Sequence, residues 1–313
     1  MNAPLLFALD ASRAYGAKAA RALDLTLAAH EERMFEDGER MLRPLAEVRG
    51  LDVFVLQSLY DEPARDLHSK LCDLLFMIGA LKDAGAARVT AIVPYLCYAR
   101  QDRRTRANDP LSLRYLAQLF ESAGTDAILA LDVHNAAAFE NAFRVPAHNI
   151  EAAPLFAMHF AALLAEEEVE VISPDLGGVK RAERFRDAVQ EQMHQDIPAA
   201  AIGKKRLDHI TNTEEIPAGV RGRTAVIFDD MIATGSTMLR AAKACRRGGA
   251  KRVFAAATHG LFLPGSQDLV ASDALDGLVV TDTVPPFRLD LELATRKLTV
   301  LDSAALLASA VAR

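Results

Sequence analysis

Residues 223–237 read Arg-Thr-Ala-Val-Ile-Phe-Asp-Asp-Met-Ile-Ala-Thr-Gly-Ser-Thr, and this stretch indicates how the chain folds. Its first part, 223–228, has the apolar composition of a buried strand and ends on two aspartates. A polar turn, Thr234-Gly-Ser-Thr237, then opens a segment of helical periodicity that runs to Arg247. A strand, a turn and a helix in this order predict one unit of a parallel α/β sheet.

The same alternation of short apolar runs and longer helical segments continues along the rest of the chain. Two predicted helices begin with N-cap signals, Asp109-Pro110 and Asp302-Ser303. The pattern predicts an α/β protein with mainly parallel sheets flanked by helices. Strands are predicted at 52–57, 88–94, 127–131, 169–173, 223–228, 252–258 and 277–281, and helices at 64–83, 110–122, 153–166, 179–194, 236–247 and 302–312.

A weak internal repeat suggests that the chain has two similar halves. Residues 83–91, Asp-Ala-Gly-Ala-Ala-Arg-Val-Thr-Ala, are echoed by residues 247–255, Arg-Gly-Gly-Ala-Lys-Arg-Val-Phe-Ala. Each copy follows a predicted helix and opens a predicted strand, although a common helix-turn-strand connection could produce the same likeness. The length of 313 residues suits two domains of ~100 to 200 residues each, which we place at 1–149 and 150–313.

Composition narrows the class of protein. Hydrophobic residues make up 51% of the chain and charged residues 25%, as in globular domains. The three cysteines are far apart, which favours a reducing compartment, and no run is long enough for a signal peptide or a membrane span. We therefore expect a cytoplasmic protein. A net charge of −6 argues against general affinity for nucleic acid, so any anionic ligand needs a local binding cluster.

The loop from Asp229 to Thr237 has the chemistry of such a cluster. Gly235 lets the backbone approach a ligand, and amides and hydroxyls at a helix start suit a terminal phosphate. The two carboxylates, Asp229 and Asp230, could accept hydrogen bonds from vicinal sugar hydroxyls, which a site for phosphate alone would not need. The combination predicts a sugar-phosphate site built from Asp229, Asp230, Ala233, Thr234, Gly235, Ser236 and Thr237.

Three other polar segments follow predicted strands. Arg100 and Gln101 come after the strand ending at 94, where a guanidinium could clamp phosphate oxygens. His134 and Asp175 also follow strands, and sparse ligation of this kind is plausible for magnesium. A basic triplet, 204–206, precedes the polar stretch 207–222, which has the look of a mobile flap. Taken singly, these segments could equally be structural or solvated surface.

The Asp229 loop resembles the phosphoribosyl diphosphate motif of type I phosphoribosyltransferases and of ribose-phosphate diphosphokinases. The diphosphokinase family is also indicated by segments in its order and spacing over nearly the full length. The resemblance implies two similar phosphoribosyltransferase-like domains. The matching segments are Phe35-Glu-Asp-Gly-Glu39, Tyr98-Ala-Arg-Gln-Asp-Arg103, Asp132-Val-His134, Ser173-Pro-Asp-Leu-Gly-Gly-Val179, Lys204-Lys-Arg206 and Ala257-Thr-His-Gly260.

The resemblance also implies a reaction: ribose 5-phosphate attacks the β-phosphorus of ATP, and AMP leaves as phosphoribosyl diphosphate forms. Lys204 and Arg206 would be catalytic, His134 and Asp175 would serve Mg²⁺, and Arg206 would join the Asp229 loop in binding ribose 5-phosphate. The implied ATP contacts are Phe35, Asp37, Glu39, Arg100 and Gln101, with the 35–39 loop reaching the site of a neighbouring subunit. The family assembles from dimers, often as hexamers, so we expect a homo-oligomer.

The sequence is also compatible with two other functions. A phosphoribosyltransferase shares the loop and tolerates Ala233, where diphosphokinases usually carry an acid, but it does not explain the ATP-side residues. A catalytically silent regulatory paralogue normally loses loop or flap residues, and here Lys204, His134 and Asp175 are all present. Departures from the common pattern at Ala107-Asn108 and Pro63-Ala-Arg-Asp66 predict an altered response to phosphate and ADP.

Overall fold

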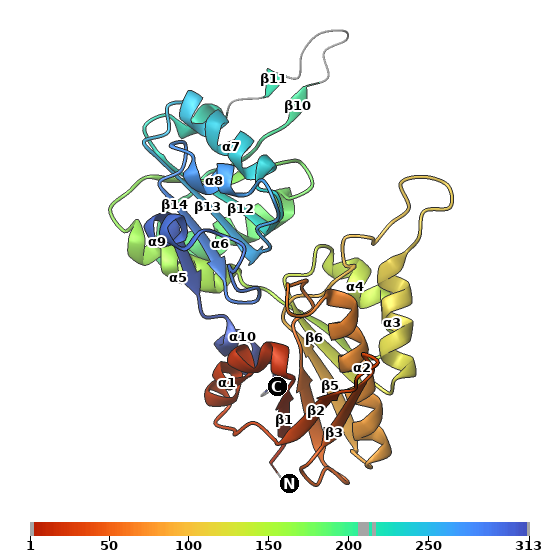
Figure 1. The fold of residues 1–313 in the computed structure, drawn as a ribbon. Helices are drawn as coiled ribbons and strands as arrows, with labels where there is room; N and C mark the ends of the chain where they lie inside the picture. Colours follow the sequence, from red (N-terminus) through yellow and green to blue (C-terminus); the bar gives the residue numbers. More distant parts are fainter. Residues whose placement is uncertain (1–2, 206–212, 215–216, 312–313) are drawn as a thin grey trace. The chain divides into compact units, whose positions relative to one another are not determined.

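The computed structural model describes residues 3–205, 213–214 and 217–311, and the chain forms two compact units (Figure 1). The first unit holds the described chain up to Glu151 together with the segment from Ala304 onward, and the second holds Ala152–Ser303. Each unit is built on one parallel sheet flanked by helices, so the predicted α/β class is confirmed. Among the described residues, no helix combines the length and apolar character needed to cross a bilayer.

The first unit contains a five-stranded sheet in the order β1-β4-β5-β6-β7, with every pair parallel. The strands β4, β5 and β6 match predicted apolar runs. The outer strands were not predicted, because β1 is short and β7, Ala-His-Asn-Ile, is largely polar. The bounds are β1 Leu5–Ala8, β4 Asp52–Leu56, β5 Arg88–Val93, β6 Ala127–Leu131 and β7 Ala147–Ile150.

Helices cover the two faces of this sheet unequally. Val53 and Val55 point to the face packed by α2, α3 and α4, where Leu74, Phe120 and Phe139 are buried. The alternate residues point to the face packed by α1 and α10. The bounds are α1 Arg13–Ala22, after the short η1 helix Asp10–Ser12, α2 Leu67–Asp83, α3 Ser112–Ser122, α4 Ala136–Ala142 and α10 Ala304–Val311.

The C-terminal helix corrects one part of the predicted domain division, in which 304–313 belonged to the second domain. Ala304 and Leu307 of α10 are buried in a cluster with α1 and with residues of the first unit's sheet. Because α10 is strongly apolar, it needs a hydrophobic partner, and that face of the sheet supplies it. Ser303, directly before α10, donates from its amide and its hydroxyl to Asp282 Oδ1, at 2.9 and 2.8 Å.

A two-stranded hairpin, β2 (His30–Met34) and β3 (Arg40–Pro44), packs against α2 in the first unit. Its turn, 35–39, is closed by the amide of Phe35 donating to the carbonyl of Glu39 at 2.8 Å. Gly38 occupies the left-handed region with φ +90°, which a side chain would disfavour. The sequence segment that resembles an ATP loop is therefore a hairpin turn.

The second unit contains a six-stranded parallel sheet in the order β15-β14-β13-β12-β8-β9. One face packs on α5 and α6 through aromatic rings; Phe185 stacks on Phe228 with centroids 4.2 Å apart. The other face packs on α7 and α8, where Met238 and Leu269 are buried. The bounds are β8 Val169–Ser173, β9 Ala199–Ala201, β12 Thr224–Ile232, β13 Arg252–Gly260, β14 Gly277–Thr281, β15 Leu298–Leu301, α5 Ala153–Leu163, α6 Val179–Met193, α7 Ser236–Arg247, α8 Gln267–Ala271 and α9 Leu291–Lys297.

Several predicted boundaries were wrong by a few residues. The strand expected to end at Phe228 continues to Ile232, because its parallel partner β13 also extends and pairs His259 with Met231. The helix expected from Pro110 begins at Ser112, because Asp109 Oδ2 instead accepts from the amides of the preceding turn at 3.0 and 2.7 Å. Likewise α2 begins after Asp66, whose side chain caps it, rather than at residue 64.

The two copies of the sequence repeat adopt the same local structure. Gly85 and Gly249 follow α2 and α7 with φ of +88° and +90°. Each accepts a hydrogen bond at its carbonyl from an earlier glycine amide, Gly50 at 2.8 Å and Gly222 at 2.9 Å. The repeat therefore corresponds to a glycine turn that connects a helix to the next parallel strand in both units.

Candidate active site

The carboxyl edge of the second unit's sheet gathers the loops that follow β8 and β12. These strands are hydrogen-bonded parallel neighbours, with Ile227 opposite Ile172, so their ends lie side by side. The loop after β8 carries Asp175, and the end of β12 carries Asp229 and Asp230. The carboxyl ends of strands are where ligands bind in open α/β sheets, so these acids occupy the expected position.

An arginine that we did not predict holds the two acids at the end of β12. Arg181 of α6 forms an ion pair with Asp229 and a second one with Asp230, at 3.2 Å between Nη1 and Oδ1. Burial of Asp229 and the neighbouring Asp230 raise the pKa of Asp229 to about 7, and the charge of Arg181 opposes this rise. The signal in the sequence was the position of Arg181, about one helical turn after Gly177-Gly178. At this position its side chain faces the neighbouring strand, β12.

The loop between β12 and α7 brings the predicted phosphate-binding groups to a helix N-terminus. Gly235 lies directly before α7 with φ +78°, and Thr234 and Ser236 on either side are exposed, with their hydroxyl oxygens 3.2 Å apart. Ala233 is anchored by its carbonyl, which accepts from the amide of Leu263 at 2.9 Å. Unsatisfied amides at a helix start and adjacent hydroxyls together suit a phosphate group. Thr237, in the first turn of α7, is half-buried.

Replacing Gly235 with alanine is expected to destabilise this loop. A Cβ at this position would lie 3.0 Å from Leu269 side-chain atoms, and the positive φ costs an L-residue about 1–2 kcal/mol. We expect Gly235→Ala to lower the free energy of unfolding by roughly 1–3 kcal/mol, measured by urea denaturation. Gly222→Ala is the matched control, since Gly222 also has positive φ, +77°, but no atom within 4 Å of its would-be Cβ. Equal losses in both variants would exclude the Leu269 contact as a cause.

Asp175 sits in a tightly hydrogen-bonded loop. Its Oδ1 accepts from the amides of Gly177 and Gly178 at 2.9 and 3.0 Å, and Ser173 Oγ donates to its backbone carbonyl at 2.6 Å. The side chain is exposed at the sheet edge. An oriented, exposed carboxylate fits the few hard ligands that magnesium takes from a protein while keeping its waters.

The basic triplet lies beyond β9 in the second unit. Lys204 is the first residue of β10 (Lys204–Lys205), which pairs antiparallel with β11 (Thr213–Glu214). Arg206 lies outside the described residues, as does half of the segment 207–222 that we expected to be a flap. The chain returns through η2 (Ala218–Val220), where a Cβ on Gly219 would come within 2.5 Å of Glu170 Oε2. This close approach seats the end of the segment on β8.

In the first unit, the loops after β5 and β6 carry the other polar candidates. The strands are parallel neighbours, and Asn135 Nδ2 donates to Asp102 Oδ2 at 2.6 Å, which joins the two loops. Arg100 and His134 are both exposed in these loops. Gln101 is oriented by Ser112, whose hydroxyl donates to its Oε1. Arg100, Gln101 and His134 therefore share one edge of the first unit.

The hairpin turn presents the remaining candidates to solvent. The ring of Phe35 is 40% exposed and lies 5.0 Å from the guanidinium carbon of Arg33. Asp37 Oδ1 accepts from the amide of Glu39 at 3.0 Å, and both acids are exposed. An exposed aromatic ring next to two carboxylates could stack on a base and accept from an exocyclic amine.

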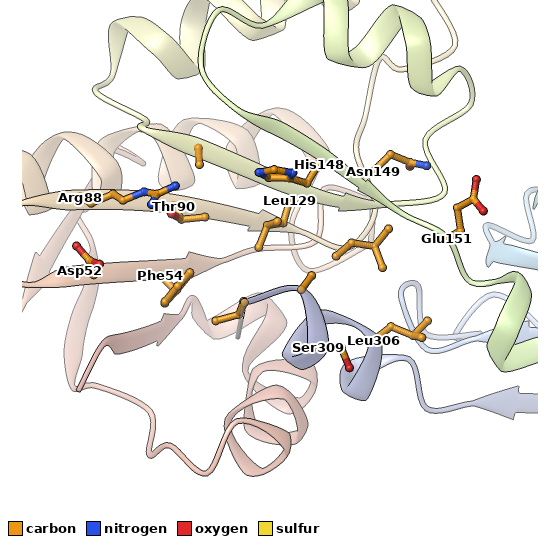
Figure 2. A pocket seen from close by; sticks show the side chains of 14 residues that line it. Asp52, Phe54, Arg88, Thr90, Leu129, His148, Asn149, Glu151, Leu306 and Ser309 are labelled. Carbon is orange, nitrogen blue, oxygen red and sulfur yellow. The ribbon is translucent and has the colours of Figure 1, made fainter. Parts of the chain in front are cut away.

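A separate cavity of about 590 Å³ lies in the first unit, on the sheet face next to α10 (Figure 2). Its lining mixes apolar side chains such as Phe54 and Leu306 with the charged Asp52, Arg88 and Glu151. None of the residues predicted from the sequence lines it. Arg88 lies opposite Asp52 at the starts of β5 and β4, and Glu151 follows β7 at the other end of the lining, a distribution of charge that does not favour a phosphate.

The second unit therefore has the features of α/β proteins that bind a phosphorylated sugar at the carboxyl edge of a parallel sheet. Residues 5–124 match the model of the N-terminal domain of ribose phosphate pyrophosphokinase, and residues 175–313 match the phosphoribosyl synthetase-associated domain. The chain belongs to the ribose-phosphate pyrophosphokinase family.

Individual relatives agree over almost the whole chain. The ribose-phosphate pyrophosphokinase of Burkholderia pseudomallei is 39% identical over an alignment covering 99% of this chain and 93% of the relative. That of Vibrio parahaemolyticus is 37% identical, covering 98% and 95%. The crystal structure of phosphoribosylpyrophosphate synthetase from Mycobacterium smegmatis superposes with a TM-score of 0.88 at 35% identity, covering 99% of this chain and 98% of that one.

Proposed function

We propose that this protein transfers the diphosphoryl group of ATP to the anomeric hydroxyl of ribose 5-phosphate, releasing AMP and 5-phosphoribosyl 1-diphosphate. The observation that carries the proposal is the acid pair Asp229 and Asp230, braced by Arg181 beside the glycine-led start of α7. Carboxylates for sugar hydroxyls and helix amides for a phosphate stand on one short loop. That arrangement fits a ribose phosphate better than a nucleoside or a free phosphate.

In this proposal the ribose ring lies over the β12–α7 loop. Asp229 and Asp230 accept hydrogen bonds from the 2- and 3-hydroxyls, and the groups of residues 233–237 bind the 5-phosphate. Lys204 and Arg206 neutralise the charge that spreads over the transferring phosphorus, so catalysis consists of positioning and charge stabilisation without a covalent enzyme intermediate. Our assignment of Arg206 rests on the sequence alone.

Magnesium is part of the proposal as the ion that accompanies ATP. Asp175 fits direct or water-mediated ligation, because its carboxylate is exposed and already oriented by two amides. His134 fits only through a bound water, since magnesium prefers oxygen ligands. When bound, the ion would neutralise negative charge on the phosphates of ATP.

The ATP side of the proposal uses the first unit. Arg100 and Gln101 bind phosphate and ribose groups of the nucleotide, while Phe35, Asp37 and Glu39 contact the base in a neighbouring subunit of a homo-oligomer built from dimers. Exposure of the Phe35 ring supports a surface role for the turn. The three cysteines, all within the described part of the chain, are free thiols, which supports a reducing, cytoplasmic setting.

A product assay tests the proposal directly. The protein is incubated with ATP, magnesium and ribose 5-phosphate, and the products are identified by mass spectrometry. We expect AMP and phosphoribosyl diphosphate in equal amounts. Release of ADP would replace the proposed reaction with transfer of a single phosphoryl group. In a parallel incubation with phosphoribosyl diphosphate and a nucleobase, consumption of both would replace it with phosphoribosyl transfer. Intact binding of both substrates without turnover would instead indicate a silent regulatory protein.

A further inference from the structure

A chain of buried charges connects the β2–β3 hairpin, close to its turn, to α2. Arg40, the first residue of β3, donates from Nη2 to Glu32 Oε2 on β2 at 2.6 Å. The Nε of the same arginine lies 3.4 Å from Oδ1 of Asp73 on α2. The other oxygen of Asp73, Oδ2, accepts from Arg65 in the loop after β4. Asp73 therefore links the hairpin and this loop through one carboxylate.

At the other end of this network of charges, the remaining oxygen of Glu32 also has polar partners. Glu32 Oε1 accepts from the amide of Asp10 at 2.6 Å, and the Nε2 of His30 lies 3.2 Å from the same oxygen. Asp10, His30 and Glu32 are close enough to surround a cation. However, both oxygens of Glu32 are already engaged by an arginine and an amide, and a guanidinium beside a metal ion would be repelled. The cluster is better suited to bracing than to metal binding.

The network is balanced in charge and poorly solvated, so each member depends on the others. The side chains of Glu32 and Asp73 are only 3% and 5% exposed, and each contacts Arg40. Burial raises the pKa of Asp73, and the charges of Arg65 and Arg40 oppose this rise. Removing one partner of such a network leaves a buried charge uncompensated.

We propose that Asp73 is a positioning residue that orients the 35–39 turn toward the nucleotide by holding Arg40. Arg40 directly follows Glu39, so fixing its side chain on α2 fixes the exit of the turn. The linkage through Arg65 ties the same turn to the loop at the carboxyl end of β4. This inference rests on the proposed function, in which the turn contacts the base of ATP.

The test is the kinetic effect of Asp73→Asn, which keeps the size of the side chain and removes its charge. Because a small misplacement of a binding group weakens only the contacts it makes, we expect the KM for ATP to rise about 10-fold. The KM for ribose 5-phosphate and kcat should change less than about 2-fold. Glu31→Gln is the matched control: it removes an exposed ion pair, Glu31 with Arg43, on the same hairpin and should leave all three constants unchanged.

Three further variants separate the possible failures. If Phe35→Ala leaves the KM for ATP unchanged, the turn does not bind the nucleotide and the proposed role of the turn is wrong. If Phe35→Ala raises that KM and Asp73→Asn does not, the positioning role of Asp73 is wrong while the proposed function stands. Where Asp73→Asn does not fold, Arg40→Lys and Arg40→Gln decide: Lys should recover most of the ATP affinity that Gln loses, and equal losses would overturn the inference.

Discussion

Replacing Lys204 with alanine is expected to lower kcat by roughly 100-fold or more while ribose 5-phosphate still binds. During diphosphoryl transfer, negative charge spreads over the oxygens between the nucleophile and the leaving group. A cation beside these oxygens therefore stabilises mainly the transition state. The ribose loop, 229–237, is separate in sequence from Lys204, so binding of the sugar phosphate should survive. Steady-state kinetics and calorimetric titration with ribose 5-phosphate measure the two effects.

Lys205→Ala is the matched control, because it removes an identical lysine side chain from the next residue. We expect the control to keep kcat within about 3-fold of the wild-type value. Near-normal turnover in Lys204→Ala would remove Lys204 from the mechanism. Equal losses in both variants would assign the effect to the general charge of the β10 strand.

Arg181→Leu is expected to produce the largest loss of stability among changes at the site. Arg181 is the cation that pairs with both Asp229 and Asp230, and the Asp230 side chain is 3% exposed. Removing it deletes both of these ion pairs while the two carboxylates stay close together, which costs about 3 kcal/mol in the free energy of unfolding. We also expect ribose 5-phosphate binding to weaken, because the repelling acids no longer hold one orientation. Urea denaturation and calorimetry provide the measurements.

The raised pKa of Asp229 predicts how the effect of Arg181→Leu on stability changes with pH. The pKa of Asp229 is raised to about 7 in the folded protein, against an ordinary value of 3.8 for an aspartate. Between these values the folded state binds more protons than the unfolded state, so stability falls as pH rises from about 4 to 7 and then levels off. Without Arg181 the folded-state pKa is higher, and the fall should continue above pH 7. The stability gap between wild type and Arg181→Leu should therefore widen from pH 7 to pH 8.5.

The double variant Arg181→Leu with Asp229→Asn tests the cause. Removing one of the two repelling carboxylates should restore part of the lost stability and abolish the extra pH dependence. An additive loss in the double variant would show that Arg181 acts through packing. A gap that stays constant with pH would contradict the assignment of the raised pKa to Asp229.

Strands and loops with a strong local signal were predictable. The run 225–228 is apolar throughout because a central parallel strand is buried on both faces, and composition alone shows this. The acids and the glycine that follow this strand predicted a ligand-binding loop, because ligands bind at the carboxyl ends of the strands of a parallel sheet. The positions of Asp175, His134 and Arg100 after strands followed from the same rule. Their roles remain proposals.

Other features depend on contacts between distant segments and left little trace in the local sequence. The β1 strand is four residues long, and it is stabilised by pairing with β4 rather than by its own pattern. The helix α10 lies in the first unit because Leu307 finds a buried partner there. Arg40 and Asp73 are 33 positions apart in the sequence, and no periodicity predicts their contact.

The sequence by itself determined the α/β class, the acid- and glycine-containing loop at 229–237 and the family to which the chain belongs. These properties reside in short segments, where burial, backbone freedom and charge act within a few residues. Only the tertiary structure decided that Arg181 braces the acid pair, that Asp73 holds the hairpin and that the last helix returns to the first unit. Each of these depends on two distant segments meeting with their charges or apolar faces matched, which folding alone brings about.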